Sequence, residues 1–498
     1  MSMFSMSRRD LLKALGLTAV GVVAAACTPS ATPTTAPAGE EPVETAAPAE
    51  EVAETITIQH WAQAAEPTAP DVELEPGEVR KVAYDEVAEA YMADHPNVKI
   101  EWYRFPAGSN IDEWLTARMT AQDAPEIYWA NSESLWPHIQ KNWALAFDPW
   151  AELPNPYVSG NERWFDQFED VAVISQTGPD GKLYGVNMDG AGVLTLYNTD
   201  AFETAGITDL PTTWTEFTGA CEALLDAGFI PYGATLAQGM TFSHWLHAHI
   251  YNQLVWDTIY DWDKDGNMVI TAKDLVLSFE EGLFPDWDAF LQFAHLFKEL
   301  TPYFPLGYEG ELDLPQLWRQ GNLAMYMEGN WGVSQLKNDP PPHGFNWLAF
   351  PIITKDIWPA APEKVVRIQG AWGAMQYHVP GYLAQTDPAR VDVIMDWLMW
   401  SSVPEHVGSI CKETGLVPLT YGAEGLPELA PFYEPYDRAV PYQSWNTMSA
   451  SAWNAECDLW QQYLPSDMTD DAFLELAEET FSAEVDKVLE ANPDWVAE

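Results

Sequence analysis

Apolar residues alternate or recur at helical spacing along the first part of the chain that could fold. Residues 55–61 alternate β-branched and polar side chains and predict a strand, and residues 97–103 predict a second one. Helical spacing over 81–95 and 111–121 predicts two helices, and a short apolar strand is expected at 125–130. This alternation of strands and helices predicts a parallel α/β sheet, whose ligands gather at the carboxyl ends of the strands.

Glycines interrupt the pattern of the next predicted strands. A Pro-Asp-Gly turn at 179–181 introduces one strand, Gly190 and Gly192 break it, and a second strand leads into a helix. An interrupted strand of this kind suits a chain that crosses between two lobes. Thr213 with Glu216 three residues later forms a capping box, which predicts a helix.

The first 54 residues differ in composition from the rest. Residues 1–26 combine a basic start with an apolar stretch of about 13 residues, too short to span a bilayer, and indicate a signal peptide. The run SRRDLLK at 7–13 resembles the twin-arginine export signal, and the small residues before Cys27 resemble a bacterial lipobox. That resemblance implies lipidation of Cys27 and anchoring to the membrane, with residues 27–54, rich in Pro, Ala, Thr and Glu, as a disordered linker.

Composition and charge narrow the classes of partner. The chain has 498 residues, 47% of them hydrophobic, with 24 Trp, 20 Tyr and 20 Phe, which indicates a folded protein. The net charge is −52, and removal of residues 1–26 makes it about −54. Such acidity excludes sequence-independent binding to nucleic acid or anionic lipid, because both need a surplus of Lys and Arg.

Three cysteines lie in the predicted folded part, namely Cys221, Cys411 and Cys457. Their spacing fits no metal site, and no CxxC pair occurs. For an exported protein we expect one disulfide and one buried thiol among them.

Seven segments together resemble one known family in their order along the chain. They are ITIQHW (56–61), PEIYWAN (125–131), DGKLYGVNMD (180–189), LTLYNTDAFETAGI (194–207), PTTWTEF (211–217), LWRQGNLAMYMEGNWG (317–332) and GLVPLT (415–420). The family is that of the extracellular solute-binding proteins, family 1, of ABC importers, which includes maltose- and other oligosaccharide-binding proteins. The resemblance covers residues 55 to about 489.

The resemblance implies a two-lobe periplasmic-binding-protein fold of type II, each lobe a mostly parallel sheet flanked by helices and joined by hinge segments. The first lobe is expected to comprise 55–188 and 351–400, and the second 191–346 and 405–498. It further implies a monomeric, exported protein at the cell surface or in the periplasm. Its partners would be a small solute, most simply a carbohydrate, and ABC transporter permease subunits.

Tryptophans next to glycine or amide residues are the candidate ligand contacts, because flat rings stack on sugar rings and amides bond hydroxyl groups. We expect Trp61, Gln63, Trp129, Asn131, Trp372 and the hinge residue Asp189 on the side of the first lobe, and Trp245, Asn330, Trp331 and Trp445 on that of the second. Glycines beside Trp331 and Trp372 are expected to let the backbone approach the ligand. Five tryptophans in helical patterns are expected in the core: Trp214, Trp287, Trp397, Trp400 and Trp460.

Two further patterns raise the question of metal binding. Asp261, Asp263 and Asp265 stand at calcium-loop positions, but Ala272 replaces the glutamate that an EF-hand needs. A turn between two strands explains the segment equally well, so calcium stays a secondary alternative and no cofactor is expected. His244, His247 and His249 lack a ligand-spaced Cys or carboxylate and favour a helix with one polar face over zinc.

No catalytic motif occurs, since the chain has no GxSxG, Walker loop or HExxH. We therefore expect a binding protein and not an enzyme. Two alternatives stay open: a secreted glycoside hydrolase, which would need two carboxylates flanking the scissile bond, and a binding protein for a cationic or peptide-like solute.

Overall fold

The computed structural model describes residues 55–493 and 495, apart from 75–78, 107–110, 132–134, 136–137, 179, 238–240, 265–269, 371–372 and 443. The chain divides into two compact units, residues 1–53 and 54–498, and the described residues all belong to the second. The predicted lipidation site Cys27, the candidate contact Trp372 and the candidate calcium ligand Asp265 lie outside the described residues.

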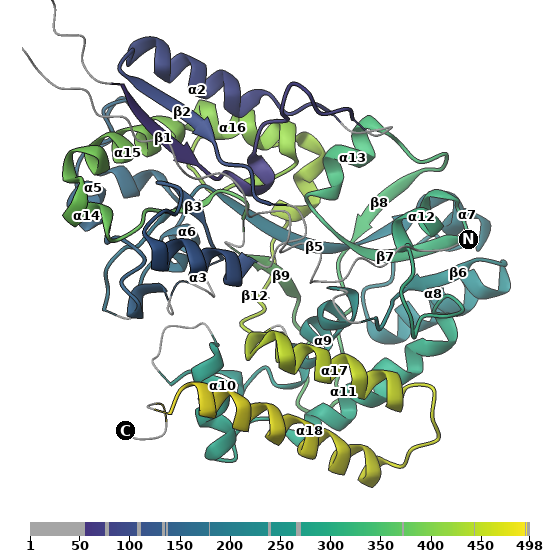
Figure 1. Ribbon diagram of the computed structural model, residues 1–498. Coiled ribbons are helices and arrows are strands. Elements are labelled where there is room, and N and C mark those ends of the chain that lie inside the picture. The colour runs from purple at the N-terminus through teal and green to yellow at the C-terminus, as the bar shows by residue number, and fades with distance from the viewer. Residues whose placement is uncertain are drawn as a thin grey trace, which may run out of the picture. The chain divides into compact units, whose positions relative to one another are not determined.

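The strand and helix order predicted for the start of the body is confirmed. Strand β1 (Ile56–His60) pairs in parallel with β2 (Val98–Trp102), and α2 (Ala83–Asp94) and α3 (Ile111–Ala121) follow the predicted ranges closely. Figure 1 shows α2 beside these two strands. The third strand, β3 (Tyr128–Trp129), is shorter than predicted.

The described strands form three sheets. The sheet of β1 and β2 is parallel, but the expectation of mostly parallel sheets is wrong for the other two. Strand β3 pairs antiparallel with β10 (Gln376–His378), which also pairs antiparallel with β4 (Val186–Asn187). In the seven-stranded sheet the order is β12, β9, β5, β7, β6, with β8 and β11 also on β5. The strands of this sheet are β5 (Asp189–Asn198), β6 (Ile230–Gly233), β7 (Leu323–Gly329), β8 (Phe345–Leu348), β9 (Val366–Gly370), β11 (Val417–Pro418) and β12 (Arg438–Ala439). Each partner of β5 runs antiparallel to it, whereas β6 pairs in parallel with β7 and β12 with β9, so the sheet is mixed.

Helices pack around these sheets (Figure 1). The longer ones are α8 (Trp214–Asp226), α9 (Thr241–Leu254), α10 (Ala272–Glu280), α11 (Trp287–Leu300), α15 (Pro388–Ser401), α16 (Pro404–Thr414), α17 (Ala450–Tyr463) and α18 (Asp470–Ala491). The shorter ones are α5 (Asp148–Ala151), α6 (Asp170–Ser175), α7 (Thr199–Thr204), α12 (Leu314–Arg319), α13 (Gly332–Asn338) and α14 (Leu383–Thr386). Among the 3₁₀ helices, η3 (Ile259–Asp261) and η6 (Trp445–Thr447) are single turns, and η5 (Pro427–Tyr433) is longer. The predicted capping box is present at the start of α8, where Thr213 and Glu216 bond each other's backbone N–H groups.

Two large sets of buried apolar residues form separate cores. We call the set drawn from residues 58–188 and 374–419 the first core, and the set drawn from 193–368 and 440–485 the second core. Strand β5 alternates in the expected way, because Val193 faces the second core while Leu194 joins a smaller cluster on the other side of the sheet. Each core is thus assembled from segments far apart in the sequence.

The packing differs from the predicted lobe ranges at two places. Ile353 and Ile368, assigned to the first lobe, pack in the second core. Val407 and Cys411 of α16, assigned to the second lobe, pack in the first core. The cause lies in long-range pairing, because β9 is held by β5 while α16 packs against α2.

Three stretches run between the cores, and we call them the crossing stretches: 188–193, 368–374 and 419–440. The first two meet directly, since Ala191 pairs with Gly370 and Gly192 with Gln369. The predicted crossing of the chain near residue 190 therefore coincides with a junction of β5 and β9.

The expectation of a disulfide is wrong. Cys221, Cys411 and Cys457 are buried, and none of these three described cysteines forms a disulfide. They lie on three different helices, α8, α16 and α17, and Cys221 and Cys411 pack in different cores.

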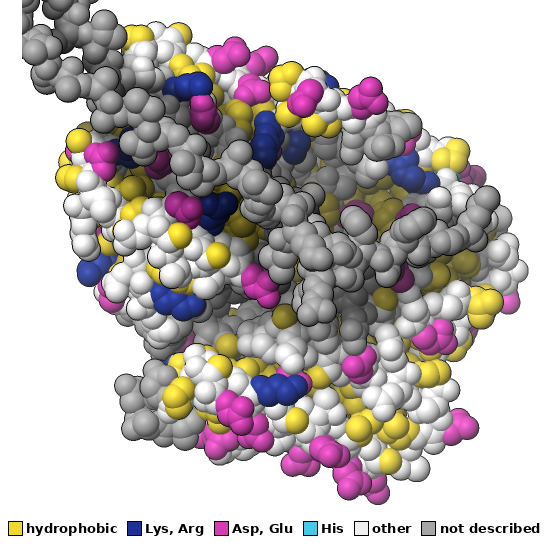
Figure 2. Space-filling model, in the orientation of Figure 1, with side chains coloured by type: hydrophobic (Ala, Val, Ile, Leu, Met, Phe, Trp, Pro, Cys, Tyr) yellow, Lys and Arg dark blue, Asp and Glu magenta, His cyan; other side chains and the backbone are white. Residues whose placement is uncertain are grey.

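The surface is strongly acidic, in line with the composition. Figure 2 shows acidic side chains along its lower edge, where α17 and α18 lie in Figure 1. On α18 the exposed acidic residues are Asp470, Asp471, Glu475, Glu478, Glu479, Asp486 and Glu490. Within the described part of the chain, no helix combines the length and apolarity needed to cross a membrane.

Candidate functional site

Asp189 opens β5 and lies in the first crossing stretch. Its side chain is fully buried, and its carboxylate accepts hydrogen bonds from the backbone N–H groups of Ala374 (3.0 Å) and Met375 (2.6 Å). Burial raises the pKa of Asp189 to about 7, although the two backbone donors act in the opposite direction. A Cβ added to Gly373 would collide with this carboxylate. Asp189 therefore joins two crossing stretches, and both of its oxygens already have donors.

Asn330 makes a second junction nearby. Its side-chain oxygen accepts from the N–H of Gly192 (2.8 Å), and its amide donates to the carbonyl oxygen of Gly415 (3.0 Å). The Asn330 backbone N–H also donates to the Gly192 carbonyl (3.0 Å). The residue is fully buried, so it holds the end of β7 against β5 and the end of α16.

Trp331 follows directly and is the one candidate tryptophan among the described residues with a largely exposed side chain, at 44%. Its ring centroid lies 5.9 Å from that of Trp245 on α9, at an interplanar angle of 49°. A Cβ on Gly329 would overlap the Trp331 ring, so the ring covers the backbone of that glycine. The glycine therefore makes room for the ring itself, which differs from the expected role of admitting a ligand. Trp331 and Trp245 form an aromatic pair with one partner open to solvent.

Trp61 and Trp129 lie together in an aromatic cluster beside the first core. Their ring centroids are 5.9 Å apart, and Trp61 stacks on Phe105 at 4.9 Å and meets Trp114 edge to face at 5.2 Å. The Trp129 indole N–H donates to the carbonyl oxygen of Gly373 (3.2 Å), in the second crossing stretch. Both rings are buried, at 2% and 9% exposure, so their faces are occupied by protein.

The remaining candidates are spread over the structure. Gln63 and Asn131 are half-buried and follow β1 and β3, as expected from the strand ends. Trp445 lies in the second core, fully buried and stacked on Phe290 at 6.1 Å. The structure therefore brings Asp189 and Trp129 to one segment, 373–375, and pairs Trp245 with Trp331, but places Trp445 in a core.

Sequence reasoning missed Glu328, Phe105 and Trp114. Glu328 accepts hydrogen bonds from the Gly329 N–H (2.8 Å) and the Tyr326 hydroxyl (3.2 Å). Burial raises the pKa of Glu328, and these donors oppose the shift. The sequence signal that could have identified Glu328 is its position directly before the Gly-Asn-Trp-Gly motif at 329–332.

The core assignment of other tryptophans is largely confirmed. Trp214, Trp397 and Trp460 are at most 1% exposed. Trp287 and Trp400 are partly buried and pack against the second and first core.

The three histidines of α9 do lie on a helix, but their polar face is buried and not solvated. His247 forms an ion pair with Glu456 of α17, whose other oxygen accepts from the Trp445 N–H (2.9 Å). His249 bonds the Trp245 carbonyl oxygen (2.9 Å). Inside the second core, a carboxylate of α17 thus pairs with His247, and a carbonyl oxygen of α9 itself bonds His249.

The calcium alternative gains no support from the described residues. Asp261 ends η3, and the segment runs into helix α10 at Ala272, so the expected turn between two strands is wrong. In the parts of the chain that the structure describes, no group of three His, Cys, Asp or Glu side chains is arranged to hold a metal ion.

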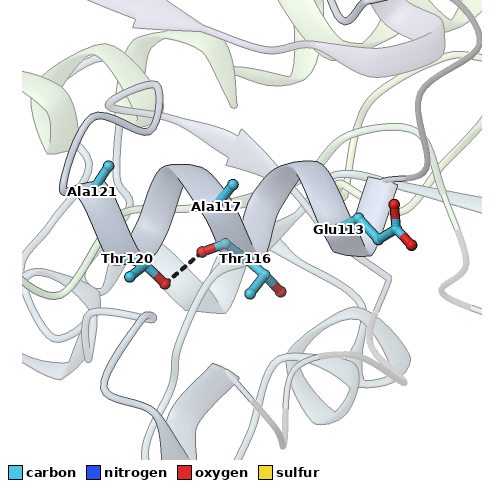
Figure 3. A pocket seen from close by; sticks show the side chains of 5 residues that line it. All are labelled: Glu113, Thr116, Ala117, Thr120 and Ala121. Carbon is cyan, nitrogen blue, oxygen red and sulfur yellow. Dashed lines mark hydrogen bonds between the residues drawn. The ribbon is translucent and has the colours of Figure 1, made fainter.

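Two surface hollows lie away from the candidate solute contacts. One, of about 590 Å³, runs along α3 and is lined by Glu113, Thr116, Ala117, Thr120 and Ala121. Figure 3 shows that these side chains come from one helix, on which the Thr120 hydroxyl donates to the Thr116 carbonyl oxygen (2.7 Å). The other, of about 410 Å³, lies near the start of α11 and includes Trp287, Asp261 and Asp286. Neither hollow contains a predicted ligand contact.

Solved structures share this fold at low sequence identity. A probable secreted solute-binding lipoprotein from Streptomyces coelicolor matches with a TM-score of 0.63 and 12% identity, over 86% of this chain and 98% of its own. A chitin oligosaccharide binding protein matches with a TM-score of 0.62 and 18% identity, over 86% and 98%. The cyclic α-maltosyl-1,6-maltose binding protein from Arthrobacter globiformis matches with 0.58 and 19%, over 87% and 98%. These likenesses establish an α/β periplasmic-binding-protein-like fold.

Curated protein sequences gave no match to this chain. The model of one protein family, described as bacterial extracellular solute-binding protein, matches residues 77–378, which is more than half of the chain. A binding-protein family agrees with the expectation that the chain is not an enzyme. By this match and by its fold, the chain belongs to the bacterial extracellular solute-binding proteins.

Proposed function

We propose that the protein is the lipid-anchored binding component of an ABC importer and that its solute is an oligosaccharide. The observation that carries the proposal is the Trp331 ring, 44% exposed beside the junction of the crossing stretches and backed by Trp245. An exposed indole face on a rigid backing is suited to stack on a sugar ring. The printed names of structural neighbours, which include binders of chitin oligosaccharide, raffinose and acarbose, support the same class of ligand.

The proposed mechanism is a shift between open and closed forms. The two cores, joined by three crossing stretches, would act as two lobes, and a ligand that contacts both lobes only when they are closed favours closure. The closed form would be the one that a permease recognises. The lipid on Cys27 would keep the protein at the membrane, with residues 28–54 as the tether.

The test is calorimetric titration of the protein from residue 55 onward with raffinose, maltooligosaccharides and chitooligosaccharides. We expect saturable binding of at least one saccharide, weakened by Trp331→Ala by about 1–3 kcal/mol through lost stacking. Trp287→Ala is the matched control, since Trp287 is a partly buried tryptophan that lines a different hollow. Binding of polyamines or peptides with no response to any saccharide would overturn the ligand class, and release of hydrolysis products would favour a glycoside hydrolase.

A further inference from the structure

We propose that Asn330 is a positioning residue, which holds the Trp331 main chain against the carboxyl end of α16 and so fixes where the ring lies. The inference rests on the proposed function, because that function assigns Trp331 to the stacking surface. The role differs from the ligand contact expected from the sequence. Asn330 is fully buried, and both ends of its amide bond backbone groups of the protein itself.

Hydrogen bonds fix the backbone on both sides of Trp331. Before the ring, the Asn330 N–H donates to the Gly192 carbonyl oxygen (3.0 Å), and the Gly192 N–H donates to the Asn330 side-chain oxygen (2.8 Å). After it, the Val333 N–H donates to the Asn330 carbonyl oxygen (3.1 Å), which closes a turn around Trp331. Asn330 is therefore the residue through which β5 holds the turn that carries the ring.

The Asn330 amide also ties this turn to α16. Its NH₂ group donates to the Gly415 carbonyl oxygen (3.0 Å), and the Ser334 hydroxyl donates to the Glu413 carbonyl oxygen in the last turn of the helix (3.0 Å). The last carbonyl groups of a helix have no donors within the helix, so side chains of another segment can bond them. Gly415 has a φ of +76°, and a Cβ there would lie 3.1 Å from the Asn330 carbonyl oxygen. The glycine at the end of α16 thus allows the two segments to meet.

The end of α16 is a firm support for the turn. The Glu413 carboxylate accepts from the backbone N–H groups of Val82 (2.8 Å) and Ala83 (3.0 Å) at the start of α2. Val407 and Cys411 of the same helix pack in the first core, whereas the strand before the turn, β7, contributes to the second. The Asn330 amide thus connects a strand of the second core with a helix of the first, directly beside Trp331.

Fixing this backbone matters for affinity because the ring itself is 44% exposed. Its aromatic neighbour, Trp245, lies on one side at 5.9 Å. A side chain that must be ordered when a ligand binds costs free energy that a ring already in place does not lose. Loss of the Asn330 amide should therefore weaken binding while the indole stays present.

The first experiment needs no ligand. Protein labelled with 5-fluorotryptophan gives a ¹⁹F resonance for Trp331, assigned by its absence in Trp331→Phe. Asn330→Asp keeps an acceptor for the Gly192 N–H but loses the donor to the Gly415 carbonyl oxygen, so we expect it to shift or broaden this resonance. Ser334→Ala removes the other bond to α16 from a half-buried side chain and should shift the resonance by a smaller amount.

Asn155→Asp is the matched control. Asn155 is also buried, its side-chain oxygen accepts from the Tyr157 N–H (3.0 Å), and its amide donates to the Met399 carbonyl oxygen (2.8 Å). Its replacement should leave the Trp331 resonance unchanged. A resonance that is unchanged in Asn330→Asp, or shifted as much by Asn155→Asp, overturns the inference. If Asn330→Asp does not fold, Ser334→Ala decides by the same criterion.

The second experiment is a calorimetric titration with the saccharide from the panel above that binds. We expect Asn330→Asp to weaken binding about threefold to tenfold and Asn155→Asp to change it little. In a Trp331→Ala background, Asn330→Asp should have little further effect, because Asn330 acts through the ring. An equal loss in both backgrounds would show that Asn330 contacts the ligand and would overturn the positioning role.

The two experiments separate the inference from the proposed function. If no saccharide binds but the Trp331 resonance responds to Asn330→Asp, the proposed function fails and the positioning role stands. If a saccharide binds and the resonance does not respond, the proposed function stands and the positioning role fails.

Discussion

The carboxylate of Asp189 accepts a 2.6 Å hydrogen bond from the backbone N–H of Met375, deep in the protein. This contact joins the start of β5 to the residue that directly follows the second crossing stretch. Burial and the charge of Asp189 both raise the pKa of Tyr84 on α2, Tyr377 on β10 and Cys411 on α16, and none of these groups carries a positive charge. A buried carboxylate without a cationic partner is expected to titrate near neutral pH.

The stability of the protein should therefore depend on pH through Asp189. Its pKa is raised from 3.8 to about 7 on folding, so between these values the folded state holds a proton that the unfolded state has released. The contribution to stability is full below pH 3.8 and is lost as the pH rises through 7, with a slope of up to ~1.4 kcal/mol per pH unit. Denaturant unfolding at several pH values should show this slope in the native protein and not in Asp189→Asn.

Asp180→Asn is the control for that measurement. Asp180 is an exposed carboxyl whose pKa is lowered, with the Tyr184 hydroxyl and the Lys182 N–H as donors outweighing the effect of burial. Its removal should leave the fall in stability between pH 4 and 7 in place. Equal slopes in Asp189→Asn and the native protein would contradict the assignment.

The ion pair between His247 and Glu456 should be important for folding of the second core. Burial would raise the pKa of Glu456, but the contact with His247, together with hydrogen bonds from the Trp460 indole and the Trp445 backbone, outweighs burial and holds the pKa below its usual range. Glu456→Gln replaces the carboxylate that pairs with His247 and accepts from the Trp445 backbone N–H by a neutral amide. We therefore expect a loss of about 3 kcal/mol in the free energy of unfolding. Chemical denaturation tests this, with the exposed pair Glu152–Arg163 as the comparison, where Glu152→Gln should change stability far less.

Trp445 and Trp331 should respond to truncation in opposite ways. Trp445 is fully buried against Phe290 and Phe481, so Trp445→Ala should lower the free energy of unfolding by about 3–5 kcal/mol through the cavity it leaves. Trp331→Ala should lower the melting temperature little, because 44% of that side chain is already exposed. Thermal unfolding of both variants decides the matter, and a strongly destabilised Trp331→Ala would show that this ring is part of a core.

The three cysteines of the folded part should behave as inert thiols. Burial raises the pKa of the Cys221 and Cys411 thiols, which keeps them protonated and unreactive at neutral pH. In protein from residue 55 onward, iodoacetamide should modify none of the three under native conditions and all three after denaturation without a reductant. A mass increase that appears only after reduction would reveal a disulfide and contradict the structure.

Local elements could be predicted from the sequence because their signals are local. The strand at 55–61 and the helix at 81–95 differ from β1 and α2 by one or two residues at each end, since hydrophobic periodicity sets them. Long-range pairing could not be predicted in this way. The antiparallel contact of β3 with β10 joins Trp129 to Tyr377, and no local pattern specifies such a partner.

At the candidate site, too, local features could be predicted from the sequence and long-range contacts could not. A tryptophan flanked by glycines was recognisable as unusual at Trp331, yet Trp445, also beside an asparagine, proved to be a core residue. Residue type does not reveal burial, because indole rings serve both purposes. The position of Asp189 near the crossing was predictable, whereas Asn330 was expected as a ligand contact of the second lobe. The backbone groups that bond these two side chains come from distant segments, which no local pattern specifies.

The interleaving of the two cores has a consequence for synthesis of the protein. The first core contains both Ile58 and Leu419, and the second contains both Val193 and Val485, so neither can be completed from a contiguous piece of the nascent chain. Contacts of such large sequence separation form slowly, since long loops must close first. An emerging chain that ends before residue 374 lacks part of the first core and exposes apolar surface until α16 has been made. The amino-terminal half must therefore be kept from aggregating until most of the polypeptide exists.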